Sequence, residues 1–203
     1  SSLFKDCALI ATAGTLFFFH LGNAAMLPLL GQSAVARFEV DPAVYTASTV
    51  FVAQTTMIAT SLLGARIAIT RGYGLLFICS LVVLPIRGLV ACFFDSPWSL
   101  VPVQILDGVG AGLLGVATPG IVARLLKGTG HINMGLGFVL AVQGVGAALS
   151  SSYGGLFARH VSYSAAFFAL ALAPCVGFLL FITAARLSPL LADAASPFTR
   201  KAP

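Results

Sequence analysis

Six long stretches of this chain carry one charged residue or none, and they constrain the fold more than any other feature. Residues 72–94 contain one charge, Arg87, and residues 96–123 contain one, Asp107. Each stretch is long enough to cross a membrane, because about 20 apolar residues at ~1.5 Å rise span the hydrocarbon layer. The four stretches without any Asp, Glu, Lys or Arg lie between Asp6 and Arg37, Asp41 and Arg66, Lys127 and Arg159, and His160 and Arg186.

The composition agrees with membrane insertion, with 59% hydrophobic residues, 8% charged residues and a mean hydropathy of +1.02. Helices are expected because a spanning segment must satisfy its own backbone, and the stretches lack the alternation of a barrel strand. We therefore predict an all-α polytopic membrane protein, with residues 1–203 forming a single bundle of six transmembrane helices. Residues 187–203 are expected to form a cytoplasmic tail. The connections are short, and only the first, residues 31–42, is predicted to be a longer loop.

The distribution of Lys and Arg predicts the orientation, since basic residues favour cytoplasmic loops. Eight basic residues fall on one side of the membrane, only Arg37 and Arg159 fall on the other, and Arg87 lies within a span. We therefore expect both termini to lie in the cytoplasm. The expected partner is the lipid bilayer of the inner or plasma membrane, and no nucleic-acid partner is expected. The first span is too long for a signal peptide, and a chain that starts with Ser1 is expected to belong to a longer or processed polypeptide. The basic residues on the cytoplasmic side are Lys5, Arg66, Arg71, Arg124, Lys127, Arg186, Arg200 and Lys201.

The cysteines give no sign of a metal site, a disulfide or a cofactor. They are scattered through apolar stretches without a Cys-x-x-Cys pair or a neighbouring histidine pair, so we expect ordinary packing. The four are Cys7, Cys79, Cys92 and Cys175.

Arg87 and Asp107 are predicted to form an ion pair inside the membrane. Arg87 precedes Asp95 by eight residues, about 12 Å along a helix, and Asp107 follows Trp98 by nine, about 14 Å. Opposite charges at similar depth on consecutive helices neutralise each other, whereas an isolated charge there costs ~3 kcal/mol. We interpret the pair first as a clip between the third and fourth spans. The alternative is that it changes state during a transport cycle.

Small residues recur at helical spacing in the fourth span, "VQILDGVGAGLLGVATPG", residues 103–120. Gly108 and Gly112 lie four residues apart, and Gly115 continues the small-residue surface before Pro119 interrupts the helix. Such a surface lets a second helix approach closely, so we predict helix packing at these four positions. Gln104 and Asp107 lie on a neighbouring strip together with Ala111.

These motifs resemble the major facilitator superfamily (MFS) of transporters. Residues 104–112, "QILDGVGAG", resemble its R-x-x-x-G-x-G-x-G signature in the fourth helix of the fold's second half. Residues 16–32 resemble the seventh helix, "LPIRGL" the ninth, and residues 125–150 the loop into the eleventh. The resemblance implies a twelve-helix protein of which this chain is the C-terminal half, partnered by an N-terminal half in the same or a separate chain.

The chain departs from the family pattern at several positions. Gln104 replaces the signature arginine, and in the loop of residues 65–74 Ile69 and Tyr73 replace an aspartate and an arginine. The resemblance implies that the first, second, fourth and fifth spans line a cavity and that Arg87 lies outside the pore, leaving Asp107 as the functional partner. Candidate cavity-lining polar residues are His20, Asn23, Gln54, Gln104 and Gln143.

We therefore hypothesise a secondary transporter that moves a small, neutral or weakly polar solute by alternating access, without catalysing a reaction. Two alternatives remain open. The first is an isolated half that folds but does not transport. The second is a rhomboid-like intramembrane serine protease, although the Gly-x-Ser-Gly motif of its nucleophile is absent and the serines at 150–152 have no membrane histidine obviously placed to serve them.

Overall fold

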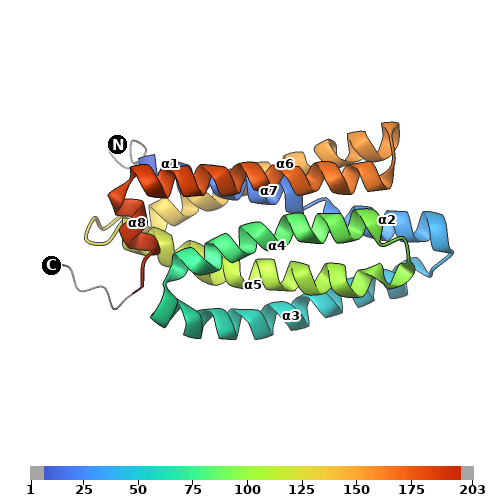
Figure 1. Ribbon diagram of the computed structural model, residues 1–203, viewed down its shortest axis with the longest axis horizontal. Helices are drawn as coiled ribbons and strands as arrows, with labels where there is room; N and C mark the ends of the chain where they lie inside the picture. The colour runs from blue at the N-terminus through green and yellow to red at the C-terminus, as the bar shows by residue number, and fades with distance from the viewer. Residues whose placement is uncertain (1–6, 198–203) are drawn as a thin grey trace.

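The computed structural model describes residues 7–197, and every regular element within them is a helix (Figure 1). Six segments are long and apolar enough to cross a membrane, with α1 and α2 together forming the first. The prediction of an all-α protein with six spans is thereby confirmed. The elements are α1 (Cys7–Asn23), α2 (Met26–Phe38), α3 (Pro42–Arg71), α4 (Tyr73–Phe93), the 3-10 turn η2 (Pro97–Ser99), α5 (Leu100–Leu125), α6 (Ile132–His160), α7 (Tyr163–Leu187) and α8 (Pro189–Ala195).

The first span differs from the prediction in two ways. It is broken at residues 24–25, between α1 and α2, and α2 then continues to Phe38. The long loop predicted over residues 31–42 is therefore wrong, and only residues 39–41 connect α2 to α3. The polar residues of this stretch suggested a loop, but Ser33 and Ala34 are buried and Arg37 forms an ion pair with Asp95 at the end of the bundle.

Local sequence explains where the helices begin and end. Asp41 caps α3, with its Oδ1 accepting a hydrogen bond from the Val44 N–H at 2.8 Å, and Pro42 occupies the first turn. Gly72 separates α3 from α4 with a φ of +81°, a conformation that glycine adopts without strain. Ser162 caps α7 in the same way as Asp41 caps α3, through the Ala165 N–H.

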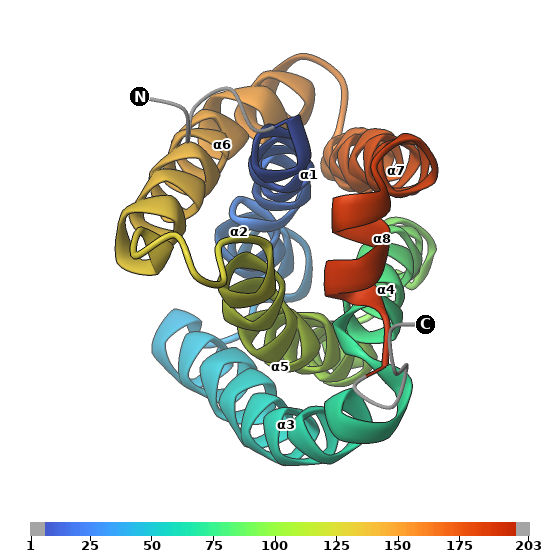
Figure 2. The same cartoon turned by 90° about the vertical axis from the view of Figure 1, so that its left-hand side faces the viewer.

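The spanning helices run roughly along one direction, with α8 lying across their end, and they form two groups in this view (Figure 2). The helices α3 and α6 flank α1, α2 and α5 on one side of the bundle, while α4 and α7 lie on the other. The apolar core includes a contact between α4 and α7, where the rings of Phe77 and Phe181 pack 4.7 Å apart. The helices α4 and α7 therefore lie on the side of the bundle opposite to α3 and α6 (Figure 2).

The helix α8 closes one end of the bundle, the end at which α1 begins (Figure 1). It packs against α4, α5 and α7, and its Leu191 is fully buried. Arg124 at the end of α5 donates from Nη1 to the carbonyl oxygen of Ser196 at 2.5 Å. Part of the predicted tail of residues 187–203 is therefore an ordered helix docked on the bundle, whereas residues 198–203 lie outside the described residues.

Candidate functional site

The break in the first span lies near the middle of the bundle's length. Asn23, the last residue of α1, is 16 residues from Cys7 and 15 residues from Phe38, the two ends of the span. The N–H of Ala25, within the break, donates to Ser150 Oγ of α6 at 2.9 Å. A backbone group freed in the middle of a membrane span needs such a partner, because lipid offers none. The break in the first span is therefore stabilised by a hydrogen bond to a second helix, α6.

Arg87 joins three helices at this break. Its side chain is only 1% exposed, and its Nη1 contacts Asp107 Oδ1 of α5 at 2.8 Å. The same Nη1 donates to Asn23 Oδ1 of α1. The structure thus brings together the two charges that were expected to pair, and it adds Asn23 as a third member. We call Asn23, Arg87 and Asp107 the polar node.

The polar node leaves part of the guanidinium unused. Arg87 Nε and Nη2 are buried without a hydrogen-bond partner within residues 7–197. Asp107 is more accessible than Arg87, with 16% of its side chain exposed. The arginine is thus the enclosed member of the pair and the aspartate lies at its edge.

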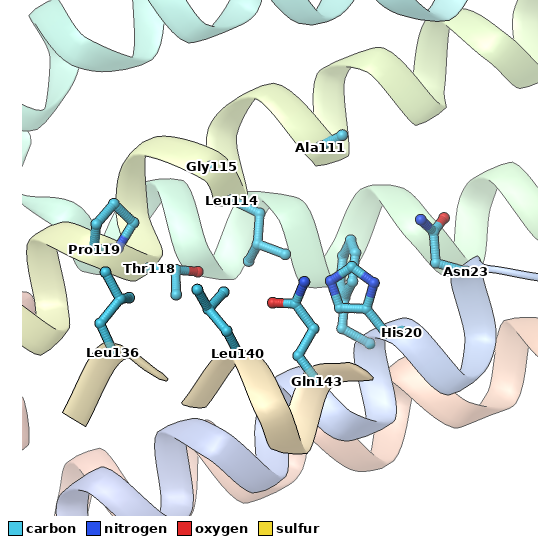
Figure 3. A pocket seen from close by; sticks show the side chains of 11 residues that line it. His20, Asn23, Ala111, Leu114, Gly115, Thr118, Pro119, Leu136, Leu140 and Gln143 are labelled. Carbon is cyan, nitrogen blue, oxygen red and sulfur yellow. The ribbon is translucent and has the colours of Figure 1, made fainter. Parts of the chain in front are cut away.

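A pocket of about 310 Å³ lies beside the node, between α1, α5 and α6 (Figure 3). His20 and Gln143 project into it from α1 and α6 toward α5, and Asn23 lies at one end (Figure 3). Among the described residues that line the pocket, none carries a formal charge. The lining residues are Phe19, His20, Asn23, Ala111, Leu114, Gly115, Thr118, Pro119, Leu136, Leu140 and Gln143.

Two polar atoms of the lining remain unpaired in the part of the chain that the structure describes. His20 Nε2 and Thr118 Oγ1 are both buried and lack a hydrogen-bond partner there, and Thr118 is only 5% exposed. Buried polar groups are normally satisfied, and an unsatisfied one costs about 1–3 kcal/mol. Apolar walls with a few convergent polar groups are typical of small-molecule sites.

The other predicted polar residues lie elsewhere. Gln54 is exposed on α3 and does not line the pocket. Gln104 of α5 is fully buried outside the pocket, and both of its amide atoms lack partners among residues 7–197. Of the five polar candidates, His20, Asn23 and Gln143 therefore meet at one pocket and the two remaining glutamines do not.

The small residues of α5 have two different roles, since some pack against α3 and others line the pocket. Gly108 and Gly112 face α3, where an added Cβ would overlap Ala53 or Thr60. Thr60 Oγ1 also donates to the Gly108 carbonyl at 2.9 Å. Gly115 differs from the packing prediction, because an added Cβ there would meet nothing within 4 Å among the described residues. Gly115 and Pro119 line the pocket instead.

Sequence reasoning missed Thr118 and the apolar part of the lining. Thr118 lies four residues after Leu114 and seven after Ala111, so all three share one helix face. Continuing the strip that begins at Gln104 and Asp107 by two further turns would have found this face. The leucines of α6 at positions 136 and 140 carry no comparable signal, since that helix is apolar on most sides.

No family model matches the chain. Two curated relatives, both described as uncharacterized MFS-type transporters, come from Mycobacterium tuberculosis strains CDC 1551 / Oshkosh and H37Rv. Each is 36% identical over 166 residues, which cover 82% of this chain and 40% of the relative. The chain is thus homologous to MFS-type transporters, which are generally not enzymes, and it spans less than half of their length.

Proposed function

We propose that the chain is the C-terminal six-helix half of an MFS secondary transporter, which moves a small solute by alternating access. The observation that carries the proposal is the pocket beside the broken first span. Transporters of this kind bind substrate near the middle of the membrane, where interrupted helices supply polar backbone and side chains. Homology to MFS-type transporters and the six spans support the same conclusion.

The exposed faces of α3 and α6 support the proposal that a second half of the transporter packs against this chain. In the most apolar window of each helix, 11% of α3 and 17% of α6 is buried, against 44% of α4 and 50% of α7. These two helices flank the side of the bundle that includes α1 and α5 (Figure 2). We propose that an N-terminal six-helix half, in the same chain or a separate one, covers this side and completes the pocket.

The pocket lining favours an uncharged or weakly polar solute. An ionised substrate buried in this site would need an opposite charge, because leaving an ion unpaired in a low dielectric is costly. The polar lining residues His20, Thr118 and Gln143 instead offer hydrogen bonds, while the leucines and Phe19 offer apolar contact. Recognition is thus expected to combine shape with a few hydrogen bonds.

The orientation proposed is with both termini in the cytoplasm. The ends of α3, α5 and α7 and the starts of α4 and α6 lie at the end of the bundle that α8 closes (Figure 1). Arg66, Arg71, Arg124, Lys127 and Arg186 are near that end, which by the positive-inside tendency is cytoplasmic. Lys5, Arg200 and Lys201 lie outside the described residues. Cysteines placed at Thr129 and Val161 test this, since an impermeant maleimide should label only Val161→Cys from outside intact cells.

A transport assay tests the function. The protein encoded by the complete gene is reconstituted in liposomes, and uptake of a panel of radiolabelled uncharged solutes is measured with and without a proton gradient. Gln143→Leu should reduce uptake of any transported solute, whereas Gln54→Leu, the same change outside the pocket, should not. If no solute in the panel is taken up, the alternative that this chain is a non-transporting half would be favoured. Equal losses in both variants would contradict the location of the site.

A further inference from the structure

Asn23 is the residue that belongs both to the polar node and to the pocket. Its Oδ1 accepts from Arg87 Nη1, and its side chain also lines the pocket. Resting on the proposed function, we propose that Asn23 is a specificity-determining residue that donates a hydrogen bond from its amide nitrogen to an oxygen acceptor on the solute. The Arg87–Asp107 pair then serves to hold that amide in one orientation.

The chemistry of the node fixes which way the amide faces. The oxygen and nitrogen of an asparagine side chain are nearly alike in shape, so their assignment depends on the partners. An arginine guanidinium only donates hydrogen bonds, so the Asn23 oxygen must face Arg87 and the Nδ2 group must face away from it. Nδ2 lies on the pocket side of the side chain in Figure 3, and no described residue accepts from it.

The same pair also restricts the rotation of the amide. Arg87 is enclosed, and Asp107 holds its Nη1 at 2.8 Å, so the donor to Asn23 has little freedom to move. Asn23 ends α1, and two residues later the Ala25 N–H donates to Ser150 of α6. The backbone and side chain of Asn23 are therefore both held in place before a solute binds, which reduces the conformational entropy lost on binding.

The geometry specifies one feature of the solute. It should carry a carbonyl, ether or hydroxyl oxygen on a body small enough for the pocket, with apolar parts against Leu114, Leu136 and Leu140. His20 Nε2 from α1 and Thr118 Oγ1 from α5, both unpaired within the described residues, offer further polar contacts to the solute. An uncharged molecule with one acceptor at its end is the simplest occupant.

A matched pair of probes tests the proposal without knowledge of the natural solute. Acetophenone has a carbonyl acceptor, and α-methylstyrene has the same shape with a methylene group in place of the oxygen. Gly115→Cys, in a background with the native cysteines replaced by alanine, supplies a thiol at an open position of the pocket. Protection of this thiol from a maleimide measures occupancy, and Ser152→Cys, an exposed position of α6 outside the lining, is the control.

Acetophenone should protect the thiol at about fivefold lower membrane concentration than α-methylstyrene, the effect of one hydrogen bond. Asn23→Asp should abolish this preference, because a carboxylate keeps the acceptor toward Arg87 but lacks the amide donors. Asn23→Ala should lose the preference too, because it removes both the amide donor and the acceptor for Arg87. An undiminished preference in Asn23→Asp, or none in the wild type, would overturn the proposal.

A second measurement works even if Asn23→Asp does not fold. The chain contains two asparagines, Asn23 and Asn133, and the second is exposed on α6. With asparagine labelled by ¹⁵N in the side chain, acetophenone should shift the amide signals of Asn23 and leave those of Asn133 unchanged. Unshifted Asn23 signals at protecting concentrations would contradict the proposal. Probe binding without any solute uptake would instead count against the transport function alone.

Discussion

The molecule contains two Arg–Asp pairs that differ mainly in where they lie. Arg37 and Asp95 are 2.6 Å apart at the end of the bundle, with side chains 35% and 67% exposed. Arg87 and Asp107 are 2.8 Å apart, with side chains 1% and 16% exposed. The shorter pair is solvated and screened, whereas the longer pair is enclosed. Energetic importance therefore follows the surroundings of each pair rather than its length.

The two pairs play different parts in the molecule because one is exposed to solvent and the other is not. Water and ions compete with the outer pair, so it does little more than tie α2 to the turn before η2. The inner pair is largely shielded from such competition, and its Arg87 bonds a third side chain, Asn23, at the wall of the pocket. The same chemical pair is thus expected to be nearly neutral in one place and structurally decisive in the other.

Asp107→Ala should have the largest effect. It leaves the enclosed Arg87 with Asn23 as its remaining contact, and an unpaired charge there should lower the free energy of unfolding by about 3 kcal/mol. Unfolding by titration with sodium dodecyl sulfate in mixed micelles, followed by circular dichroism, measures the change. A loss below about 1 kcal/mol would show that water already solvates the arginine.

Ser150→Ala should have the next largest effect. It removes the acceptor of the Ala25 N–H beside the node and leaves that buried donor unpaired, which should cost about 1–2 kcal/mol. The same unfolding assay applies, with Ser152→Ala on an exposed turn of α6 as the matched control. Equal stability of the two variants would mean that the break in the first span does not depend on α6.

Replacing both charges should restore most of the stability. Arg87→Met combined with Asp107→Leu removes the ions together, and apolar isosteres of a buried pair usually come within about 1 kcal/mol of the original. The double variant should be more stable than Asp107→Ala while losing the preference for acetophenone, because Asn23 is no longer oriented. If it were as unstable as the single variant, packing rather than charge would explain the first result.

Arg37→Ala should have the smallest effect, under about 1 kcal/mol, as is usual for exposed pairs. The effect should shrink further when the unfolding assay is repeated in 1 M salt, whereas the effect of Asp107→Ala should persist. A larger loss for Arg37→Ala than for Asp107→Ala would show that burial does not decide which pair stabilises the protein more.

Several features were predictable because they depend on position along the chain. Charge-free length located the spans, and helical rise placed Arg87 and Asp107 at similar depth. Neither quantity specifies how a helix is rotated about its axis. Gly115 illustrates the limit, since its spacing from Gly108 and Gly112 suggested one packed surface, but it faces the pocket rather than α3.

The sequence by itself determined the class of the protein, the number of spans, their order and the level of each charge, because apolar length and helical rise are properties of the chain alone. The tertiary structure decided where the first span breaks, that Asn23 joins the Arg87–Asp107 pair, and which polar side chains share a pocket. These features depend on which face each helix turns to its neighbours. In spans that are apolar nearly all round, no hydrophobic stripe specifies that rotation, so only packing fixes it.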